Sequence, residues 1–564
     1  SPSPGLAFSP SPGLAFCCRA GRQQTSTLTM RFHREPLASS VDENEGGEEE
    51  MIKTIQIMDT TLRDGLQSFG VHLSVPERQQ VAEFLLRRVR VDSLEVASAR
   101  VGGDEHETLT TIVKWAASHH CLERIEALGF IDGTSSVEWI ASAGCRTINI
   151  LAKGSERHCR KQLHWTLNDQ VEYLGVEVEA ARSRGMAVNV YLEDWSQGMR
   201  QSPEFVSAFA LQLAKLPIER VMLCDTLGVL YPLEVRRYVQ VVRTLLPRQK
   251  LDFHGHNDRG LATANTLLAI EGGVDGVHVA VNGMGERAGN TPLEEVVVNI
   301  KDFLGHAGFL VNIDESQLTV ASRMVAAFSA RRVPPNKPIV GANVFSQTAG
   351  VHIDGDVKDE LYVSDLRPER FGAQVTHVLG HLGGKASVKS NAKKLGLDLS
   401  VEELELVTEK VQELGANHSL SPSDLLAIVA DILDRPELVT ISLVKVVTNS
   451  VFAKSASANA VIAHNGKHYA ITARGGGGFD AFWNALRKWA RGYGVIVIPE
   501  LVHYDIDVPT SGDSSALTTV IITWRIPDKS EFITTGLDRD QVMAGIKAAV
   551  AAVNLASHRK GKQS

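Results

Sequence analysis

Two histidines separated by one residue are the clearest metal-binding pattern in the sequence. His254 and His256 lie at the end of a short apolar run that is typical of a strand. Alternate residues of a strand point to the same side, so both imidazoles can reach one ion. Taken alone, the pattern also fits two polar residues that bind nothing. With the carboxylate of Asp64, the imidazoles form a facial set that leaves coordination positions open for a substrate.

Asn290 and Arg63 extend this candidate metal centre. Asn290 lies in the sequence GERAGNT and offers an amide oxygen as a further ligand, while Gly285 and Gly289 allow the loop to approach the ion. Arg63 directly precedes Asp64. Its permanent planar charge suits a substrate carboxylate or a developing enolate oxygen. The alternative role of Arg63 is to close a structural ion pair.

Polar side chains also follow two other strand-like runs. The carboxylate of Glu193 suits proton transfer, or it holds a catalytic group through hydrogen bonds. Asp194 beside it fits equally well as an acid at a helix N-terminus, where the helix dipole favours negative charge. The hydroxyl of Thr226 suits a substrate carboxylate, or it caps the helix that follows.

One histidine outside the strand-like runs is a candidate acid or base. His352 lies in the sequence SQTAGVHID, and its imidazole can exchange protons near neutral pH. Tyr362 follows it and can assist it. From the sequence alone, a partly buried packing residue is the favoured interpretation of Tyr362.

Short apolar runs alternate with helix-period segments from residue 52 onward. Such an alternation indicates parallel strands that are buried on both faces. Eight units predict an α/β fold, a (β/α)8 TIM barrel, in which chemistry lies at the C-terminal ends of the strands. An open doubly wound sheet is the rival, but DTTLRDG is not its usual Gly-rich first turn. The runs are 54–58, 93–96, 125–130, 147–151, 187–192, 220–223, 251–254 and 277–281.

The chain divides into four predicted parts. Residues 1–50 are expected to be a disordered extension, because they cannot bury enough apolar surface to offset their ordering entropy; an organelle transit peptide is the alternative. Residues 51–310 form the barrel and residues 311–436 form helical linker subdomains. Residues 437–560 repeat a βββα pattern, which predicts an α+β domain for regulation or dimer formation.

The composition is that of an ordinary globular protein. The apolar fraction is 43%, the charged fraction is 22% and the net charge is −8. This balance gives no reason to expect nucleic acid or an anionic membrane as a partner. The sequence contains no run of about 18 or more apolar residues, so we expect no transmembrane helix. The six cysteines form no CxxC pair, which favours reduced thiols and a cytoplasmic location.

Four motifs together resemble the isopropylmalate synthase branch of the DRE-TIM metallolyase family. They are DTTLRDG (59–65), HGHND (254–258), NGMGERAGN (282–290) and AGVHIDG (349–355). The resemblance covers residues 53–554. It implies an acyltransferase that condenses acetyl-CoA with a 2-oxo acid, above all 2-oxoisovalerate, as in the first step of leucine biosynthesis.

The resemblance also implies roles for individual residues. Arg63 serves in catalysis and substrate binding, and Glu193 supports the reacting centre. Thr226 contacts the carboxylate of the 2-oxo acid, and His352 takes part in acid–base chemistry with Tyr362 beside it. The C-terminal domain resembles an allosteric leucine-binding domain that forms a homodimer. A divalent cation (Mg²⁺, Mn²⁺ or Zn²⁺) is held by Asp64, His254, His256 and Asn290.

Some positions depart from the family pattern. Leu66 stands where the family usually has Glu, and residues 475–478 and 510–515 differ from the usual sequences of the C-terminal domain. These differences weaken leucine as the effector. Citramalate synthase, with pyruvate as acceptor, and homocitrate synthase share the motifs and are the close alternatives. An acyl-CoA lyase would need a cysteine in a late Gly-rich loop, and none follows Cys224; a non-catalytic amino-acid sensor leaves Arg63, Glu193 and His352 unexplained.

Overall fold

The computed structural model describes most of the chain beyond residue 51. The described residues are 52–347, 355, 359, 361–362, 364–373, 376–377, 379, 384–415, 420–450, 455–493, 496–507, 518–526 and 531–563. The predicted extension 1–50 and His352 lie outside them. None of the helices in the described ranges is long and apolar enough to cross a membrane.

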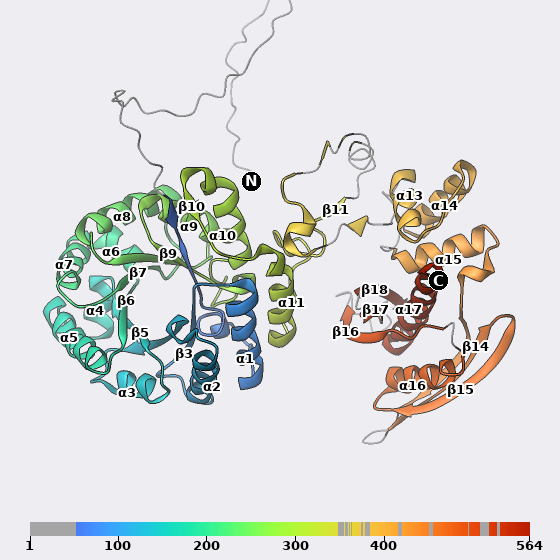
Figure 1. The fold of residues 1–564 in the computed structure, drawn as a ribbon, viewed down its shortest axis with the longest axis horizontal. Coiled ribbons are helices and arrows are strands. Elements are labelled where there is room, and N and C mark those ends of the chain that lie inside the picture. The colour runs from blue at the N-terminus through green and yellow to red at the C-terminus, as the bar shows by residue number, and fades with distance from the viewer. Residues whose placement is uncertain are drawn as a thin grey trace, which may run out of the picture. The chain divides into compact units, whose positions relative to one another are not determined.

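Eight parallel strands close into a barrel, which confirms the predicted fold class (Figure 1). The first strand, β2, pairs with β3 on one side and with β9 on the other, so the cylinder has no free edge. Closure brings residues from distant parts of the chain to one mouth. The strands are β2 (Gln56–Asp59), β3 (Ser93–Ser98), β4 (Ile125–Phe130), β5 (Thr147–Lys153), β6 (Ala187–Glu193), β7 (Arg220–Asp225), β8 (Lys250–Gly255) and β9 (Gly276–Val279).

Helices surround the strands and bury their outer faces (Figure 1). Capping boxes fix the starts of two of them, through Ser74 with Glu77 and through Thr166 with Asp169. The helices are α1 (Val75–Phe84), α2 (Glu105–Ser118), α3 (Ser135–Ser142), α4 (Glu156–Gln162), α5 (Leu167–Ser183), α6 (Trp195–Gln201), α7 (Pro203–Leu213), α8 (Pro232–Leu245), α9 (Ala262–Gly272) and α10 (Leu293–Asn299).

The barrel interior carries polar side chains. On β5, Ile148 and Ile150 belong to the core beneath the helices. Asn149 lies between them and so points to the opposite side, where its amide donates a hydrogen bond to Glu95 at 2.8 Å. Asn189 donates in turn to Asn149 at 2.9 Å. Branched aliphatic residues usually fill this space, so a polar interior points to a function beyond packing.

Helices and two βββα units follow the barrel, as predicted (Figure 1). The strands of each unit pair antiparallel in sequence order. The helices between the barrel and these units are α11 (Leu318–Ser329), α13 (Lys385–Lys394), α14 (Val401–Leu414) and α15 (Pro422–Ile432). The first unit is β13 (Ser442–Asn449), β14 (Ala456–His464), β15 (Lys467–Gly475) and α16 (Gly478–Ala490). The second is β16 (Glu500–Asp507), β17 (Thr518–Arg525), β18 (Glu531–Asp538) and α17 (Gln541–Gln563).

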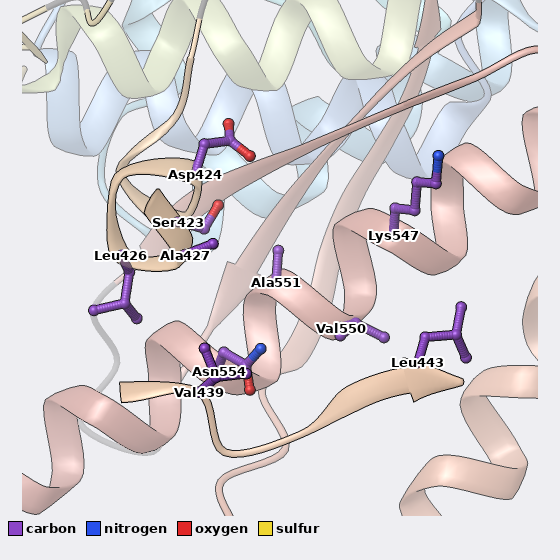
Figure 2. Close-up of a pocket in the computed structure, with 10 residues that line it drawn as sticks. All are labelled: Ser423, Asp424, Leu426, Ala427, Val439, Leu443, Lys547, Val550, Ala551 and Asn554. Carbon is purple, nitrogen blue, oxygen red and sulfur yellow. The ribbon is translucent and has the colours of Figure 1, made fainter. Parts of the chain in front are cut away.

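A second hydrophobic core joins α15 to the two βββα units. Figure 2 shows α15, β13 and α17 around a cavity of about 200 Å³. The side-chain amide of Asn554 accepts a hydrogen bond from the backbone N–H of Ile441 at 2.8 Å and donates one to its carbonyl at 2.9 Å. This double hydrogen bond fastens α17 to the start of β13. The C-terminal units therefore share one core with α13, α14 and α15.

Candidate active site

One carboxylate and two imidazoles meet at the C-terminal mouth of the barrel. Asp64 follows β2, His254 lies on β8 and His256 follows β8. The Nε2 atom of His254 is 3.1 Å from Asp64 Oδ2 and 3.3 Å from the Nε2 atom of His256. The Nε2 atom of His256 is 3.8 Å from Asp64 Oδ2. All three side chains are buried, and one ligand atom of each lies close enough to share a cation.

The ionisation states of these groups suit a cation. Burial alone would raise the pKa of Asp64, but the Arg63 guanidinium and a hydrogen bond from His254 hold it well below its usual value. Burial lowers the pKa of His254, and burial with the neighbouring His254 lowers the pKa of His256 to about 4. At neutral pH the set is therefore one carboxylate with two neutral imidazoles. Metal ligands must be deprotonated in this way.

The loop that carries Asn290 is folded tightly beside these groups. The side chain of Asn290 donates a hydrogen bond to the Met284 carbonyl at 2.9 Å. Its Oδ1 atom is buried and has no hydrogen-bond partner within the described residues, which suits a metal ligand. A Cβ on Gly289, where φ is +91°, would lie 1.9 Å from the Gly283 carbonyl oxygen. The glycine is thus needed for the loop to close on itself as well as for access to an ion.

Arg63 lies beside the candidate metal ligands in a buried ion pair. Its Nε donates to Glu95 at 2.5 Å, and its guanidinium lies 3.3 Å from Asp64. Although burial alone would lower the pKa of Arg63, these two carboxylates raise it well above its usual value. Arg63 therefore fits both roles that the sequence left open: it forms a structural ion pair, and it places a permanent charge next to the candidate metal ligands.

Two residues of this network escaped the sequence analysis. Glu95 on β3 accepts from Arg63, and Tyr191 on β6 donates its hydroxyl to Glu95 at 3.2 Å. The guanidinium of Arg63 lies 5.6 Å from the centre of the Tyr191 ring. Both residues lie within apolar runs, where a single polar or aromatic residue is inconspicuous. The sequence does not say which alternate residues of these strands point into the barrel, so their inward direction could not be predicted.

Glu193 ends β6 and forms an ion pair with Lys153 at the end of β5. The two residues are register partners on adjacent strands, so the pair lies at the barrel mouth. Asp194 takes the N-cap position of α6, but its side chain makes no capping hydrogen bond. Its carboxylate accepts instead from the Ser155 hydroxyl at 2.7 Å. The structure therefore separates the roles of the two neighbouring acids.

Thr226 lies at the same mouth, after β7. Its hydroxyl oxygen accepts a hydrogen bond from the backbone N–H of Asp194 at 2.8 Å. The next helix begins at Pro232 with Tyr231 at its N-cap, so the alternative that Thr226 caps this helix is wrong. Because the oxygen acts as an acceptor, the hydroxyl hydrogen remains able to donate to a substrate carboxylate.

The predicted acid–base pair is only partly described. His352 lies outside the described residues. Tyr362 has 47% of its surface exposed, which is compatible with a partly buried packing residue as well as with a catalytic one. Its ring leaves no room for a Cβ at Gly355, the last residue of the AGVHIDG motif. Tyr362 therefore packs against Gly355.

Three family models match the chain in succession. They are described as HMGL-like (residues 54–325), homocitrate synthase post-HMGL domain-like (339–419) and LeuA allosteric (dimerisation) domain (419–557). The (R)-citramalate synthase CimA of Methanocaldococcus jannaschii is 31% identical over 89% of this chain and 99% of the relative. The 2-isopropylmalate synthase of Ruminiclostridium cellulolyticum is 31% identical over 89% of this chain and 97% of the relative.

The chain belongs to the family of 2-isopropylmalate and (R)-citramalate synthases. It is an acyltransferase enzyme of this family, which confirms the predicted resemblance. The HMGL-like match contains the barrel and its candidate metal ligands, and the LeuA match covers both βββα units as far as residue 557. The two kinds of relative match over similar lengths and at equal identity, so they leave the acceptor substrate open.

Substitution of one imidazole should abolish metal-dependent stabilisation. Saturating Mn²⁺ or Mg²⁺ at 100 times its Kd should stabilise the wild type by about 2.7 kcal/mol, because the ion binds only the folded state. Thermal unfolding of chelator-treated protein, with and without added ion, measures this difference. The His256→Ala variant should lose the shift, whereas the exposed His306→Ala control should keep it. An undiminished shift in His256→Ala would exclude this residue as a ligand.

Proposed function

We propose that the protein condenses acetyl-CoA with a 2-oxo acid in a metal-dependent Claisen reaction. The observation that carries the proposal is the convergence of Asp64, His254 and His256 beside the buried Arg63–Glu95 pair. A divalent cation (Mg²⁺, Mn²⁺ or Zn²⁺) held by these three ligands and Asn290 would supply a Lewis acid for the ketone of the 2-oxo acid. The donor set and its ionisation fit such an ion.

The other residues bind the acceptor and stabilise charge. The hydroxyl of Thr226 donates to the carboxylate of the 2-oxo acid. A base removes a proton from the methyl group of acetyl-CoA, and the resulting carbanion attacks the ketone carbon. The ketone oxygen then takes the negative charge, and the guanidinium of Arg63 stabilises it. Hydrolysis of the thioester releases CoA and a dicarboxylic acid.

We propose that His352 is the base that removes the methyl proton of acetyl-CoA. Tyr362 assists it, and Glu193 supports the reacting centre. This assignment follows from the family resemblance and from the proton exchange of imidazole near neutral pH. The ion pair with Lys153 keeps a carboxylate from Glu193 at the mouth, which supports its part in the proposal.

The acceptor that we propose is a short aliphatic 2-oxo acid. Next to Arg63, the interior carries a small apolar cluster that includes Tyr191, Leu128 and Met58, with Phe130 and Leu151 packed against it. Such a surface suits an alkyl group. The resemblance favours 2-oxoisovalerate, whereas the bulk of these side chains favours the smaller pyruvate as a second candidate.

Thiol release in the presence of different acceptors tests the function directly. With acetyl-CoA and Mn²⁺ or Mg²⁺, we expect release with pyruvate or 2-oxoisovalerate, little release with 2-oxoglutarate and none after chelation. If Leu128 limits the space, Leu128→Ala should shift the preference towards 2-oxoisovalerate by about tenfold, the value of one or two methylene groups. Turnover with 2-oxoglutarate alone would contradict the proposed acceptor, and release that resists chelation would contradict the metal.

We further propose a division of roles along the chain. Residues 51–310 perform the chemistry, residues 311–436 link the barrel to the C-terminal domain, and residues 437–560 regulate the activity and form a homodimer. The match to a LeuA allosteric (dimerisation) domain supports this division. A hollow of about 570 Å³ lies between α16 and β16. Its lining combines the aromatic rings of Phe479, Trp483 and Tyr504 with the charged groups Asp480, Arg487 and Glu500. Opposite charges beside an apolar wall suit a free amino acid such as leucine.

Removal of one charge from this hollow should abolish feedback inhibition. Leucine, or isoleucine if the altered loop sequences change the preference, should lower turnover of the wild type and quench Trp483 fluorescence. Arg487→Ala should keep its uninhibited turnover and lose at least about tenfold in effector affinity, the usual value of a charge-assisted hydrogen bond. The exposed Arg539→Ala variant is the matched control. Unchanged inhibition of Arg487→Ala would place the effector elsewhere.

A further inference from the structure

A chain of polar side chains, buried between its two end arginines, runs through the barrel from the candidate active site to the opposite end. Tyr191 donates to Glu95, and the Nδ1 atom of His278 lies 3.2 Å from the Tyr191 hydroxyl. The Nε2 atom of His278 is 3.5 Å from Asp252, which accepts a hydrogen bond from Arg220 at 2.5 Å. In order, the chain is Arg63, Glu95, Tyr191, His278, Asp252 and Arg220.

His278 occupies the middle of this chain and is fully enclosed. It lies on β9, next to β2 on one side and β8 on the other. Its side chain has no exposed surface, and its ring packs edge-on against those of Tyr191 and His254. Burial of a histidine, an aspartate and an arginine in one barrel is costly compared with an aliphatic filling. The cost indicates that these groups have a role other than packing.

The hydroxyl of Tyr191 links His278 to the candidate catalytic groups. Glu95 can only accept hydrogen bonds, so the single hydroxyl hydrogen of Tyr191 is directed to it. The hydroxyl oxygen is then held from the other side by His278. Glu95 in turn holds Arg63 by its Nε atom. Arg63 also donates from Nη2 to the Tyr191 hydroxyl at 3.4 Å. The position of the Arg63 guanidinium therefore depends on His278 through Tyr191 directly and through Tyr191 and Glu95 together.

We infer that His278 is a positioning residue for the condensation. It holds the Tyr191 hydroxyl against Glu95, and so fixes the guanidinium of Arg63 towards the oxygen on which negative charge develops. This inference rests on the function proposed above. Because the charge develops only in the transition state, a displaced guanidinium lowers kcat and leaves the KM for the 2-oxo acid nearly unchanged.

Two conservative substitutions of His278 separate its two contacts. In His278→Asn, the side-chain amide takes the place of Nδ1 and can still reach Tyr191. In His278→Gln, the amide takes the place of Nε2 and faces Asp252 instead. We expect kcat of the Gln variant to fall about 10- to 100-fold, as for a lost hydrogen bond in a charged network, and kcat of the Asn variant to stay within about threefold.

A double-mutant cycle decides whether His278 acts through the hydroxyl. In a Tyr191→Phe background, the ring remains but the link is cut, so His278→Gln should cause no further loss of kcat. Tyr238→Phe, a half-buried tyrosine of α8 outside the barrel, is the matched control. Bound metal per chain and the unfolding temperature show whether each variant keeps its fold and its metal.

The outcomes separate this inference from the proposed function. If the wild type releases thiol but the losses from His278→Gln and Tyr191→Phe multiply, His278 does not act through Tyr191. Equal kcat values for the Asn and Gln variants would also overturn the inference, while the function stands. If the metal-loaded wild type releases no thiol with any 2-oxo acid, the proposed function fails and this inference fails with it.

Discussion

The buried charge balance around Asp64 is the constraint on which the candidate site depends. An ionised carboxylate without partners would be strongly disfavoured at this depth, yet Arg63 and His254 hold it in the ionised form. Arg63 is itself buried and needs Glu95 as a second partner. Only a closed barrel brings these residues together, because β2 meets β8 through β9 at the closing seam. The fold and the electrostatics of the site therefore support each other.

Much of this arrangement could be predicted from the sequence. The eight apolar runs predicted the barrel, since parallel strands buried on both faces leave that signature. HGHND and DTTLRDG predicted which side chains converge, because both motifs follow such runs. Glu95, Tyr191 and His278 were missed, because each is one polar or aromatic residue among aliphatic neighbours. Their inward direction depends on strand phase, and their contacts link strands that are distant in sequence.

The two faces of the barrel strands have different roles: the outer face packs against the helices, and the inner face positions polar side chains. On its outer face, β5 contributes Ile148 and Ile150 to an ordinary aliphatic core. On its inner face, Asn149 joins a hydrogen-bonded network that ends at Arg63. Apolar residues such as Leu128 form a separate cluster in the interior. One cylinder thus holds both a charged network and an apolar surface.

We propose that Asp64, His254 and His256 hold one divalent cation at the mouth of the barrel. X-ray absorption spectroscopy of the Mn²⁺- or Zn²⁺-loaded enzyme measures the ligands directly. We expect scattering from two imidazole rings together with oxygen ligands in the wild type, and the loss of one ring in His256→Ala. A spectrum with oxygen ligands alone, or one that His256→Ala leaves unchanged, would contradict this proposal.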